Sequence, residues 1–384
     1  MDFSKLTQYM DTLVSEKIPE LGVAVPSIDM IVCRDHQPLY RHMAGWRDAE
    51  KKQPLRGDET YNLYSATKVF TTCAAMQLIE RGKMRLDDPV SMYLPAYAQL
   101  TVKDGDTVRK AQRPMLVRHL MSMQSGLNYN YETAPIREII EKTNGQATTR
   151  QIVDAKAQDP LEFEPGTNFL YSLSHDALAA VIEEAAGMRF SEYLKKNIFD
   201  PLGIQDTCFK LPPEKLDRQC AQYMYNGEKK AFDPMEKDDL NYRFTPNYES
   251  GGAGLISSVQ DYITFADAIA CGGKTRDGAH ILSPEMIQLW SANQLGPDSR
   301  RAFDAWNRKG YSYGLGVRTR VDTAIGGRGS VGEFGWDGAA CAYTAIDPHA
   351  HLSIYIAMHV RNFVYAYDVI HPTLRDLAYG ALEE

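Results

Sequence analysis

Ser65 and Lys68 stand three residues apart, where a polar, turn-rich run gives way to a helical pattern. Apolar residues recur at helical spacing after Lys68, which predicts a helix over 67–81 with Gly82 as its C-terminal cap. Residues i and i+3 share a helical face, so the lysine amine can lie beside the serine hydroxyl. A partly desolvated amine loses its proton readily and can activate such a hydroxyl as a nucleophile. The helix N-terminus also offers backbone N–H groups to a developing oxyanion.

The Ser-x-x-Lys pattern is weak evidence when taken alone. A chain of this length should contain about one copy by chance, and this chain contains a single copy, at 65–68. A solvent-exposed helix start explains the four residues equally well. The rest of the sequence therefore has to decide between the two interpretations.

Two further places could complete a site for acyl transfer. Tyr171 follows the turn at 164–166 and precedes a helical pattern, so its phenol could pass protons between nucleophile and leaving group. The run 335–339 (Gly-Trp-Asp-Gly-Ala) enters a predicted strand, and its glycines permit close approach of backbone N–H groups to a ligand. Alone, Tyr171 could equally be one of 22 tyrosines in the core, and 335–339 could be a simple tight turn.

The composition is that of a globular protein with ample core material. The 384 residues are 44% hydrophobic and 24% charged, with a net charge of −8, and no block of Lys or Arg argues for nucleic-acid binding. The six cysteines are scattered without CxxC spacing, which favours reduced structural thiols. We see no signal peptide and no membrane-spanning stretch, and we therefore expect a cytoplasmic protein, unless a leader was removed.

The order of predicted elements indicates an α+β fold. A sheet built from both chain ends, residues 1–85 and 248–384, is expected beside a mainly helical insertion at 86–247, with the active site in the cleft between them. The predicted helices cover 3–18, 67–81, 116–123, 149–157, 175–186, 193–199 (stopped by Pro201), 259–270 and 372–382. The predicted strands cover 23–33, 39–46, 254–256, 313–321, 339–346 and 352–360.

Taken in order, these motifs resemble the serine β-lactamase and penicillin-binding-protein superfamily, and most closely its class C β-lactamase-like family VIII carboxylesterases. The resemblance spans nearly the whole chain and rests on 65–68, 117–120 running into 125–127, 163–166 before Tyr171, 251–255 and 335–339. It implies a β-lactamase/transpeptidase-like fold, an antiparallel sheet flanked by helices. It also implies that Ser65 is the acylated nucleophile and that Lys68 and Tyr171 share the general-base and general-acid roles. The N–H groups of Ser65 and Ala339 would then form the oxyanion hole.

Two departures from the family pattern bear on the substrate. Leu173 stands where the superfamily usually has Asn, and Trp336 stands where it usually has Lys or His. Neither offers a charge to a substrate carboxylate, so neutral esters with small apolar acyl groups are favoured. The expected substrate-binding residues are Leu173, Trp336, Asp337 and Gly338.

The sequence therefore predicts a serine esterase that works through an acyl-enzyme, without metal or cofactor, on a small-molecule ester or amide. A β-lactamase or a D-amino-acid peptidase or amidase is the first alternative, and a non-catalytic binding relative is the second. No Gly-x-Ser-x-Gly elbow, HExxH motif or phosphate-binding loop is present. His349, His351 and His359 could form a metal-ligand set, but we interpret them as surface histidines. No membrane partner is expected, and the sequence does not indicate the oligomeric state.

Overall fold

The computed structural model describes residues 1–236 and 244–383. Its central feature is an eight-stranded sheet in the order β10-β11-β12-β13-β14-β1-β2-β3, in which all neighbouring strands are antiparallel. The strands are β1 (Ser27–Arg34), β2 (Gln37–Asp48), β3 (Gln53–Pro54), β10 (Tyr311–Tyr313), β11 (Arg318–Arg320), β12 (Phe334–Gly335), β13 (Tyr343–Asp347) and β14 (Leu352–Ala357). The sheet thus joins both ends of the chain, and the predicted antiparallel sheet of an α+β fold is confirmed.

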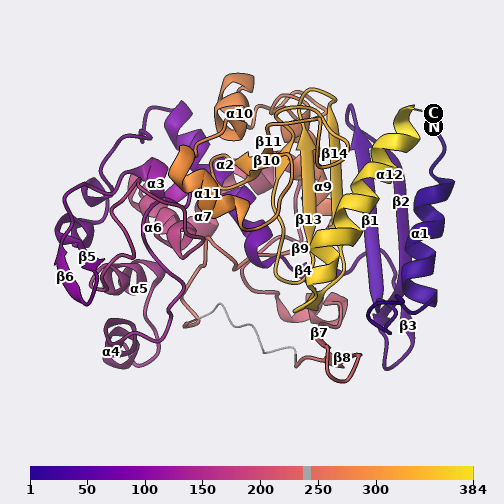
Figure 1. Cartoon of the computed structure of the whole chain (residues 1–384), viewed down its shortest axis with the longest axis horizontal. Helices are drawn as coiled ribbons and strands as arrows, with labels where there is room; N and C mark the ends of the chain where they lie inside the picture. The colour runs from indigo at the N-terminus through magenta and orange to yellow at the C-terminus, as the bar shows by residue number, and fades with distance from the viewer. Residues whose placement is uncertain (237–243, 384) are drawn as a thin grey trace.

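Helices cover both faces of this sheet, which explains why its central strands are apolar on both sides. Along β1, Met30 and Val32 pack in one hydrophobic cluster with helix α1 (Ser4–Ser15), whereas Ile31 and Cys33 belong to the other cluster. Helices α1 and α12 (His371–Glu383) lie on one face, and α9 (Val259–Ala270) packs against the other. Figure 1 shows α1 and α12 beside the sheet, with the two chain termini close together.

The second half of the molecule surrounds helix α2 (Thr67–Glu80). All but two of its residues are buried, which is the pattern of a helix enclosed on every side. It packs against α6 (Ser174–Ala186) and α7 (Phe190–Leu194), as Figure 1 shows. The other helices are α3 (Val117–Met121), α4 (Ala134–Lys142), α5 (Thr149–Lys156), α8 (Asp200–Leu202), α10 (Pro284–Ser291) and α11 (Pro297–Asp304).

The region 86–247 contains strands that the sequence did not predict. They are β5 (Thr101–Asp104), β6 (Thr107–Lys110), β7 (Tyr223–Asn226) and β8 (Ala231–Pro234). Each is only four residues long and partly exposed, so it carries little apolar alternation. Strand β7 pairs with β15 (Val360–Arg361) near the large sheet, so this part of the predicted insertion lies against the α/β half. Residues 237–243 of the insertion lie outside the described residues, and its boundaries stay a prediction.

Three predicted strands were wrong in extent. The strand expected over 313–321 is the hairpin β10–β11, because Gly314 to Val317 form a tight turn in which Gly316 has φ +74°. The strand expected over 339–346 begins only at Tyr343, after a turn. The strand expected over 352–360 is interrupted at His359, whose φ of +58° separates β14 from β15.

The predicted end of one helix was also wrong. Pro201 does not stop the helical run before it, since it lies in the first turn of α8.

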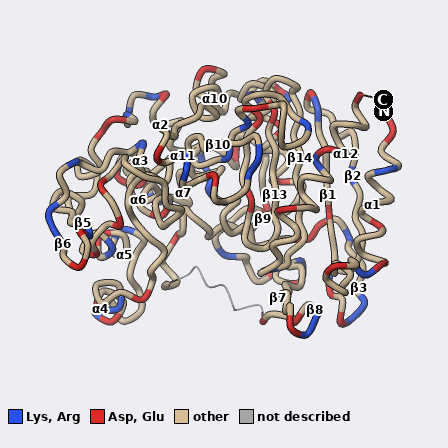
Figure 2. The backbone as a smooth tube through the Cα atoms, viewed as in Figure 1, with Lys and Arg blue, Asp and Glu red and all other residues tan. Residues whose placement is uncertain are grey.

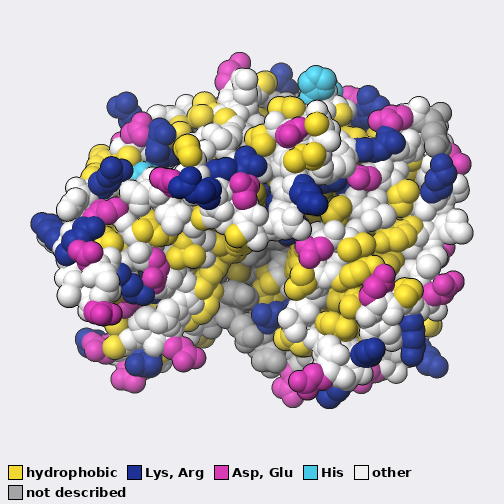
Figure 3. Space-filling view, in the orientation of Figure 1, with side chains coloured by type: hydrophobic (Ala, Val, Ile, Leu, Met, Phe, Trp, Pro, Cys, Tyr) yellow, Lys and Arg dark blue, Asp and Glu magenta, His cyan; other side chains and the backbone are white. Residues whose placement is uncertain are grey.

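Positively and negatively charged residues are mixed over the described part of the chain, without a large region of one sign. Acidic and basic side chains are interspersed along the chain (Figure 2), in keeping with the absence of a basic stripe in the sequence. In the orientation of Figure 1, the surface is hollowed between the sheet half and the helical half, and hydrophobic side chains lie along the hollow (Figure 3). Among the described residues, the helices are all too short or too polar to cross a bilayer.

Replacement of Gly316 by alanine should weaken the junction between the sheet and the helices. A Cβ there would lie 2.2 Å from Thr72 Oγ1 and 2.5 Å from His175 Nε2, in a residue that also has positive φ. Gly203→Ala is the matched control, because Gly203 has φ +68° but nothing within 4 Å. We expect Gly203→Ala to cost about 1 kcal/mol and Gly316→Ala about 3 kcal/mol in the free energy of unfolding, measured with urea. Equal losses in the two variants would contradict this account.

Candidate active site

Ser65 lies in a sharp turn immediately before α2. The turn is a short 3-10 segment, Tyr64–Ala66, and Tyr64 has φ +47°, an uncommon conformation for a residue other than glycine. Neighbouring groups hold it in place: Gln222 Nε2 donates to the Tyr64 hydroxyl at 2.7 Å, and the Tyr262 hydroxyl donates to Ala66 O at 3.0 Å. The turn leaves Ser65 partly exposed while its neighbours are buried.

Lys68 is fully buried beneath this turn. Its Nζ lies 3.1 Å from Ser65 Oγ, 2.7 Å from Gly252 O and 3.2 Å from the Tyr129 hydroxyl oxygen. The amine is therefore held between the serine, a backbone carbonyl and a phenol. The structure thus brings Ser65 and Lys68 together at the spacing expected from a shared helical face.

The 251–255 segment brings the backbone close to this lysine. A Cβ on Gly251 would lie 2.4 Å from His175 O, and one on Gly252 would lie 2.6 Å from an Asp176 carboxylate oxygen. A side chain at 251 would therefore collide with the backbone of α6, and one at 252 with a carboxylate that lies near Lys68. These two glycines are therefore required by packing, which gives a physical reason for the segment noted in the sequence.

Burial governs the protonation of Lys68. Loss of water lowers the pKa of the Lys68 amine to about 7, while the nearby charge of Asp176 opposes the shift. Asp176 is buried too, and burial raises the pKa of its carboxyl, although hydrogen bonds from Ser250 (2.5 Å) and Tyr248 (2.8 Å) favour its charged form. The site therefore holds an amine that can exist in its neutral form near neutral pH.

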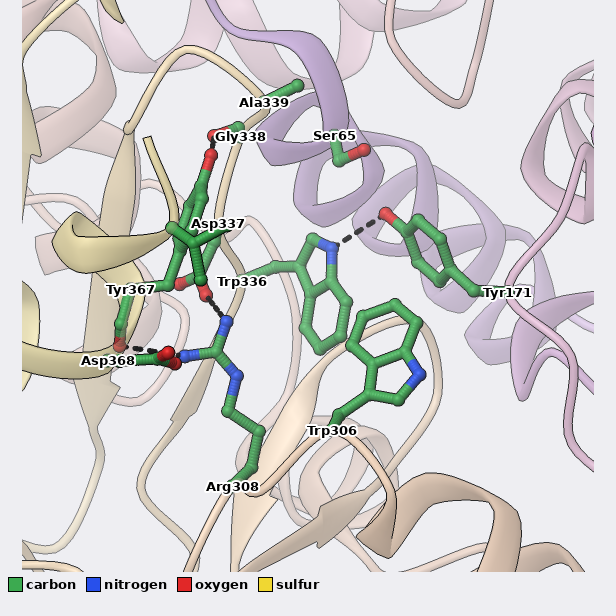
Figure 4. A pocket seen from close by; sticks show the side chains of 11 residues that line it. Ser65, Tyr171, Trp306, Arg308, Trp336, Asp337, Gly338, Ala339, Tyr367 and Asp368 are labelled. Carbon is green, nitrogen blue, oxygen red and sulfur yellow. Dashed lines mark hydrogen bonds and ion pairs between the residues drawn. The ribbon is translucent and has the colours of Figure 1, made fainter. Parts of the chain in front are cut away.

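Tyr171 lies next to Lys68 and is oriented by Trp336. The Lys68 Nζ is 4.6 Å from the centre of the Tyr171 ring, and the Trp336 indole N–H donates to the Tyr171 hydroxyl oxygen at 2.8 Å. Figure 4 shows the Tyr171 hydroxyl and Ser65 directed toward the same space. The phenol oxygen is the acceptor in this hydrogen bond, so the bond to Trp336 does not use the phenol proton.

Tyr129 is a residue of this cluster that the sequence analysis missed. Its hydroxyl is a partner of Lys68 Nζ, and its ring centre is 5.7 Å from that of Tyr171. The only signal was its position, two residues after the 125–127 segment in a polar loop. As one of 22 tyrosines, it carried no pattern that separated it from a core aromatic.

The 335–339 segment ends in a turn at the cavity that Ser65 lines. Cys341 N–H donates to Gly338 O at 2.9 Å, which closes a turn and leaves the Ala339 N–H without a partner in the described part of the chain. A Cβ on Gly338 would lie 2.1 Å from Leu63 O. Glycine is therefore needed for this turn to pack against the backbone just before Ser65. Ser65 and Ala339 both line one cavity.

This cavity has a volume of about 400 Å³, and most of its wall is aromatic or aliphatic (Figure 4). Trp336 and Tyr171 form its inner wall, while the exposed side chains of Trp306 and Val364 lie at its edge. The residues that line it are Ser65, Tyr171, Trp306, Arg308, Trp336, Asp337, Gly338, Ala339, Val364, Tyr367 and Asp368. Leu173 is buried at the start of α6 and is not among them, so its predicted contact with substrate stays a prediction.

Two of the three charged residues in the cavity wall, Arg308 and Asp337, are paired with each other. Asp337 accepts from Arg308 at 2.6 Å and from Arg318 at 3.1 Å. Burial raises the pKa of the Asp337 carboxyl, but the two guanidinium groups outweigh it and hold that pKa below its usual value. Asp337 is thus a carboxylate already bound by two arginines, and the Arg308 guanidinium in the cavity wall is already paired.

The interpretation of three surface histidines was wrong for one of them. His349 and His351 are exposed, but His359 is 1% exposed. Asn62 N–H donates to His359 Nε2 at 3.1 Å, while His359 Nδ1 lies 3.1 Å from Cys220 O. Burial lowers the pKa of His359 to about 4, so it acts as a neutral structural group between β4 (Thr60–Asn62) and β7. All six cysteines are free thiols, as predicted.

Comparison with known proteins places this architecture in one family. A family model described as Beta-lactamase matches residues 7–377, and the chain therefore belongs to the beta-lactamase family. Its curated relatives include the acyltransferase mokF of Monascus pilosus, 30% identical over 68% of this chain and 65% of the relative. They also include the esterase EstB of Burkholderia gladioli, 28% identical over 70% of this chain and 71% of the relative.

A solved structure shares the fold over nearly the full length. EstCE1, a hydrolase with promiscuous acyltransferase activity, superimposes with a TM-score of 0.80 over 98% of both chains at 24% identity. At that identity the likeness establishes the fold alone.

The pKa of Lys68 can be measured directly. In protein labelled with [¹³Cε]lysine, we expect one resonance to titrate near pH 7, far below the other lysines, because the amine is desolvated. Asp176→Asn should move that midpoint to lower pH, because it removes the charge that favours the ammonium form. The exposed Asp298→Asn is the control and should leave it unchanged. A Lys68 midpoint near 10 would refute the proposed environment.

Proposed function

We propose that this protein is a serine hydrolase that cleaves carboxylic esters of small apolar acyl groups through an acyl-enzyme on Ser65. One observation carries the proposal: the Ser65 hydroxyl lies 3.1 Å from a fully buried Lys68 amine, at the wall of a largely apolar cavity. Burial lowers the pKa of that amine to about 7, so a large fraction is neutral and can accept a proton near neutral pH.

Acylation would begin with attack of Ser65 Oγ on the ester carbonyl carbon. The serine proton passes to the neutral Lys68 amine, which becomes an ammonium, and a tetrahedral oxyanion forms. The N–H groups of Ser65 and Ala339 are the proposed donors to that oxyanion, since both residues line the cavity. Collapse of the intermediate breaks the bond to the alcohol oxygen and leaves the acyl group on Ser65.

The leaving alcoholate must receive a proton, and Tyr171 is the proposed donor. Its hydroxyl oxygen already accepts from the Trp336 indole at 2.8 Å, so its proton can be directed toward the leaving oxygen. Lys68, 4.6 Å from the ring centre, stabilises the phenol oxygen if it becomes charged. Water then attacks the acyl-enzyme with the same groups acting in reverse, and the carboxylic acid is released.

The preference for apolar acyl groups follows from the cavity wall. Trp306, Trp336 and Tyr171 present aromatic surface, and the nearest guanidinium, Arg308, is already paired with Asp337. A substrate carboxylate would have to displace that ion pair, whereas a neutral acyl chain would not. This distinguishes ester cleavage from the β-lactamase and D-amino-acid peptidase alternatives, whose substrates carry such a carboxylate.

Labelling and a substrate screen together test the proposal. After treatment with an activated phosphonate, the adduct should map to Ser65 by peptide mass spectrometry. Ser65→Ala should lose the adduct and at least about 10³-fold in ester turnover, because no other nucleophile replaces it. Turnover of p-nitrophenyl esters should be highest among short acyl chains, from acetate to octanoate.

Ser125→Ala is the matched control, because Ser125 is buried, bonded to Ser174 at 2.7 Å, and outside the cavity lining. It should retain both labelling and turnover. Full activity in Ser65→Ala would refute the nucleophile. Nitrocefin or D-Ala-D-Ala peptide turnover matching the best ester would favour the alternative hydrolases, and failure of every ester and phosphonate would favour a binding protein.

Acyl transfer to an alcohol is a second candidate function. The acyltransferase names among the relatives support it, as does the position of the exposed Trp306 at the edge of the cavity, where an acceptor could stack. An alcohol would then replace water in the second step and form a new ester.

The two outcomes can be separated by partitioning a single acyl-enzyme. With p-nitrophenyl butyrate and rising concentrations of benzyl alcohol, transfer should give benzyl butyrate at the expense of butyric acid, while p-nitrophenol release stays constant if acylation limits the rate. Trp306→Ala should lower the ester-to-acid ratio several-fold, because it removes stacking surface worth about 1 kcal/mol. If the ratio of benzyl butyrate to butyric acid never differs from the ratio formed without enzyme, a transferase is excluded.

A further inference from the structure

A second cluster of reactive side chains lies on the face of the sheet covered by α9. His36 stands in the turn between β1 and β2, and Asp267 and Cys271 stand four residues apart at the C-terminal end of α9. His36 Nδ1 lies 2.8 Å from an Asp267 carboxylate oxygen, and the Cys271 sulfur lies 3.9 Å from the other. One imidazole nitrogen, one carboxylate oxygen and one sulfur are thus within 4.8 Å of one another.

The cluster is largely buried yet open to a cavity. The side chains of His36 and Asp267 are only 23% and 11% exposed, and Cys271 is half-buried. His36 and Asp267 line a cavity of about 830 Å³, together with the buried thiol of Cys33 from β1. Solvent and small ions therefore have a route to these side chains.

The backbone fixes the histidine in an unusual place. Asp35 and His36 occupy a two-residue hairpin turn with φ of +50° and +61°, positions that favour Asn-Gly. The side chain of His36 reaches from this turn to α9, a separate element of the fold. Residues i and i+4 of a helix share a face, so Asp267 and Cys271 both point toward the same ring.

We propose that His36, Asp267 and Cys271 bind a zinc ion that ties the β1–β2 hairpin to α9. Imidazole nitrogen, carboxylate oxygen and thiolate sulfur are all ligands of Zn²⁺, and a water from the adjoining cavity completes a tetrahedron. On binding, Zn²⁺ displaces the Cys271 thiol proton to solvent and forms the Zn–S bond, with no change of oxidation state. Small side-chain rotations suffice, because the ligand atoms already lie within 4.8 Å of one another.

The proposed ion has a structural role and takes no part in the chemistry at Ser65. Tyr262, near the start of α9, reaches the Ser65 turn through Ala66, whereas the zinc ligands lie at the opposite end of the helix. The competing explanation is a simple His36–Asp267 ion pair with a neighbouring thiol. The two explanations differ in whether the sulfur becomes a ligand.

Metal titration of the reduced full-length protein tests this directly. Zn²⁺ titrated in competition with a chromophoric chelator should bind with one equivalent per chain. Co²⁺ in its place should give a near-ultraviolet sulfur-to-metal charge-transfer band, the signature of thiolate ligation. Cys271→Ala should abolish that band, and Asp267→Asn should weaken Zn²⁺ binding at least about tenfold. Zn²⁺ should raise the melting temperature of the wild type and not that of Cys271→Ala.

Matched controls separate the cluster from other candidate ligands. Cys208→Ala removes a half-buried thiol elsewhere, and Asp277→Asn removes a carboxylate from the wall of the same cavity. Both should keep the band and the affinity. Absence of the band in the wild type, retention of it in Cys271→Ala, or recovery of a Cys33–Cys271 disulfide in place of bound metal would each overturn the proposal. Ester turnover should be the same with and without Zn²⁺.

Discussion

The burial of one amine is the constraint on which the rest of the site depends. Lys68 is enclosed by the turn that carries Ser65, by the carbonyl of Gly252 and by the phenol of Tyr129. Desolvation makes its charged form costly, and the nearby charge of Asp176 offsets part of that cost. Gly251 and Gly252 permit this enclosure, because a side chain at 251 would collide with the backbone of His175 and one at 252 with the Asp176 carboxylate. An amine in solvent would be protonated at neutral pH and could accept no proton from the serine.

The aromatic wall of the cavity depends on Trp336, which stands where the family pattern usually has Lys or His. In place of a cation, Trp336 supplies a neutral N–H, and that donor is used to orient Tyr171. Asp337 in the wall is held by Arg308 and Arg318, so the guanidinium of Arg308, which lines the cavity, is already paired. The same substitution therefore orients the proposed proton donor and removes a charge that would attract anionic substrates.

The sheet and the helical half meet at the reactive residues, so the stability of the junction and the geometry of the site are coupled. The strand pair β4–β9 (Thr60–Asn62 with Ile256–Ser258) leads into the Ser65 turn, and Leu255 N–H donates to the Thr67 hydroxyl at 3.1 Å. The close approach of Gly338 to Leu63 fixes the third side of the cavity. Leu63 and Gly338, 275 positions apart in the chain, are thus held within contact distance by backbone packing.

Local pattern alone determined the helix after Ser65 and the hairpin of β1 and β2, because periodic apolar residues and turn residues report directly on backbone conformation. The antiparallel sheet was implied by the resemblance to a known family. The spacing of Ser65 and Lys68 also fixed their proximity, since a helical turn is a local structure. Only the tertiary structure decided that Tyr129 contacts Lys68, that His359 is buried and that residues 313–321 form two strands. Those outcomes depend on which distant groups exclude water or approach the backbone, and no local spacing encodes that.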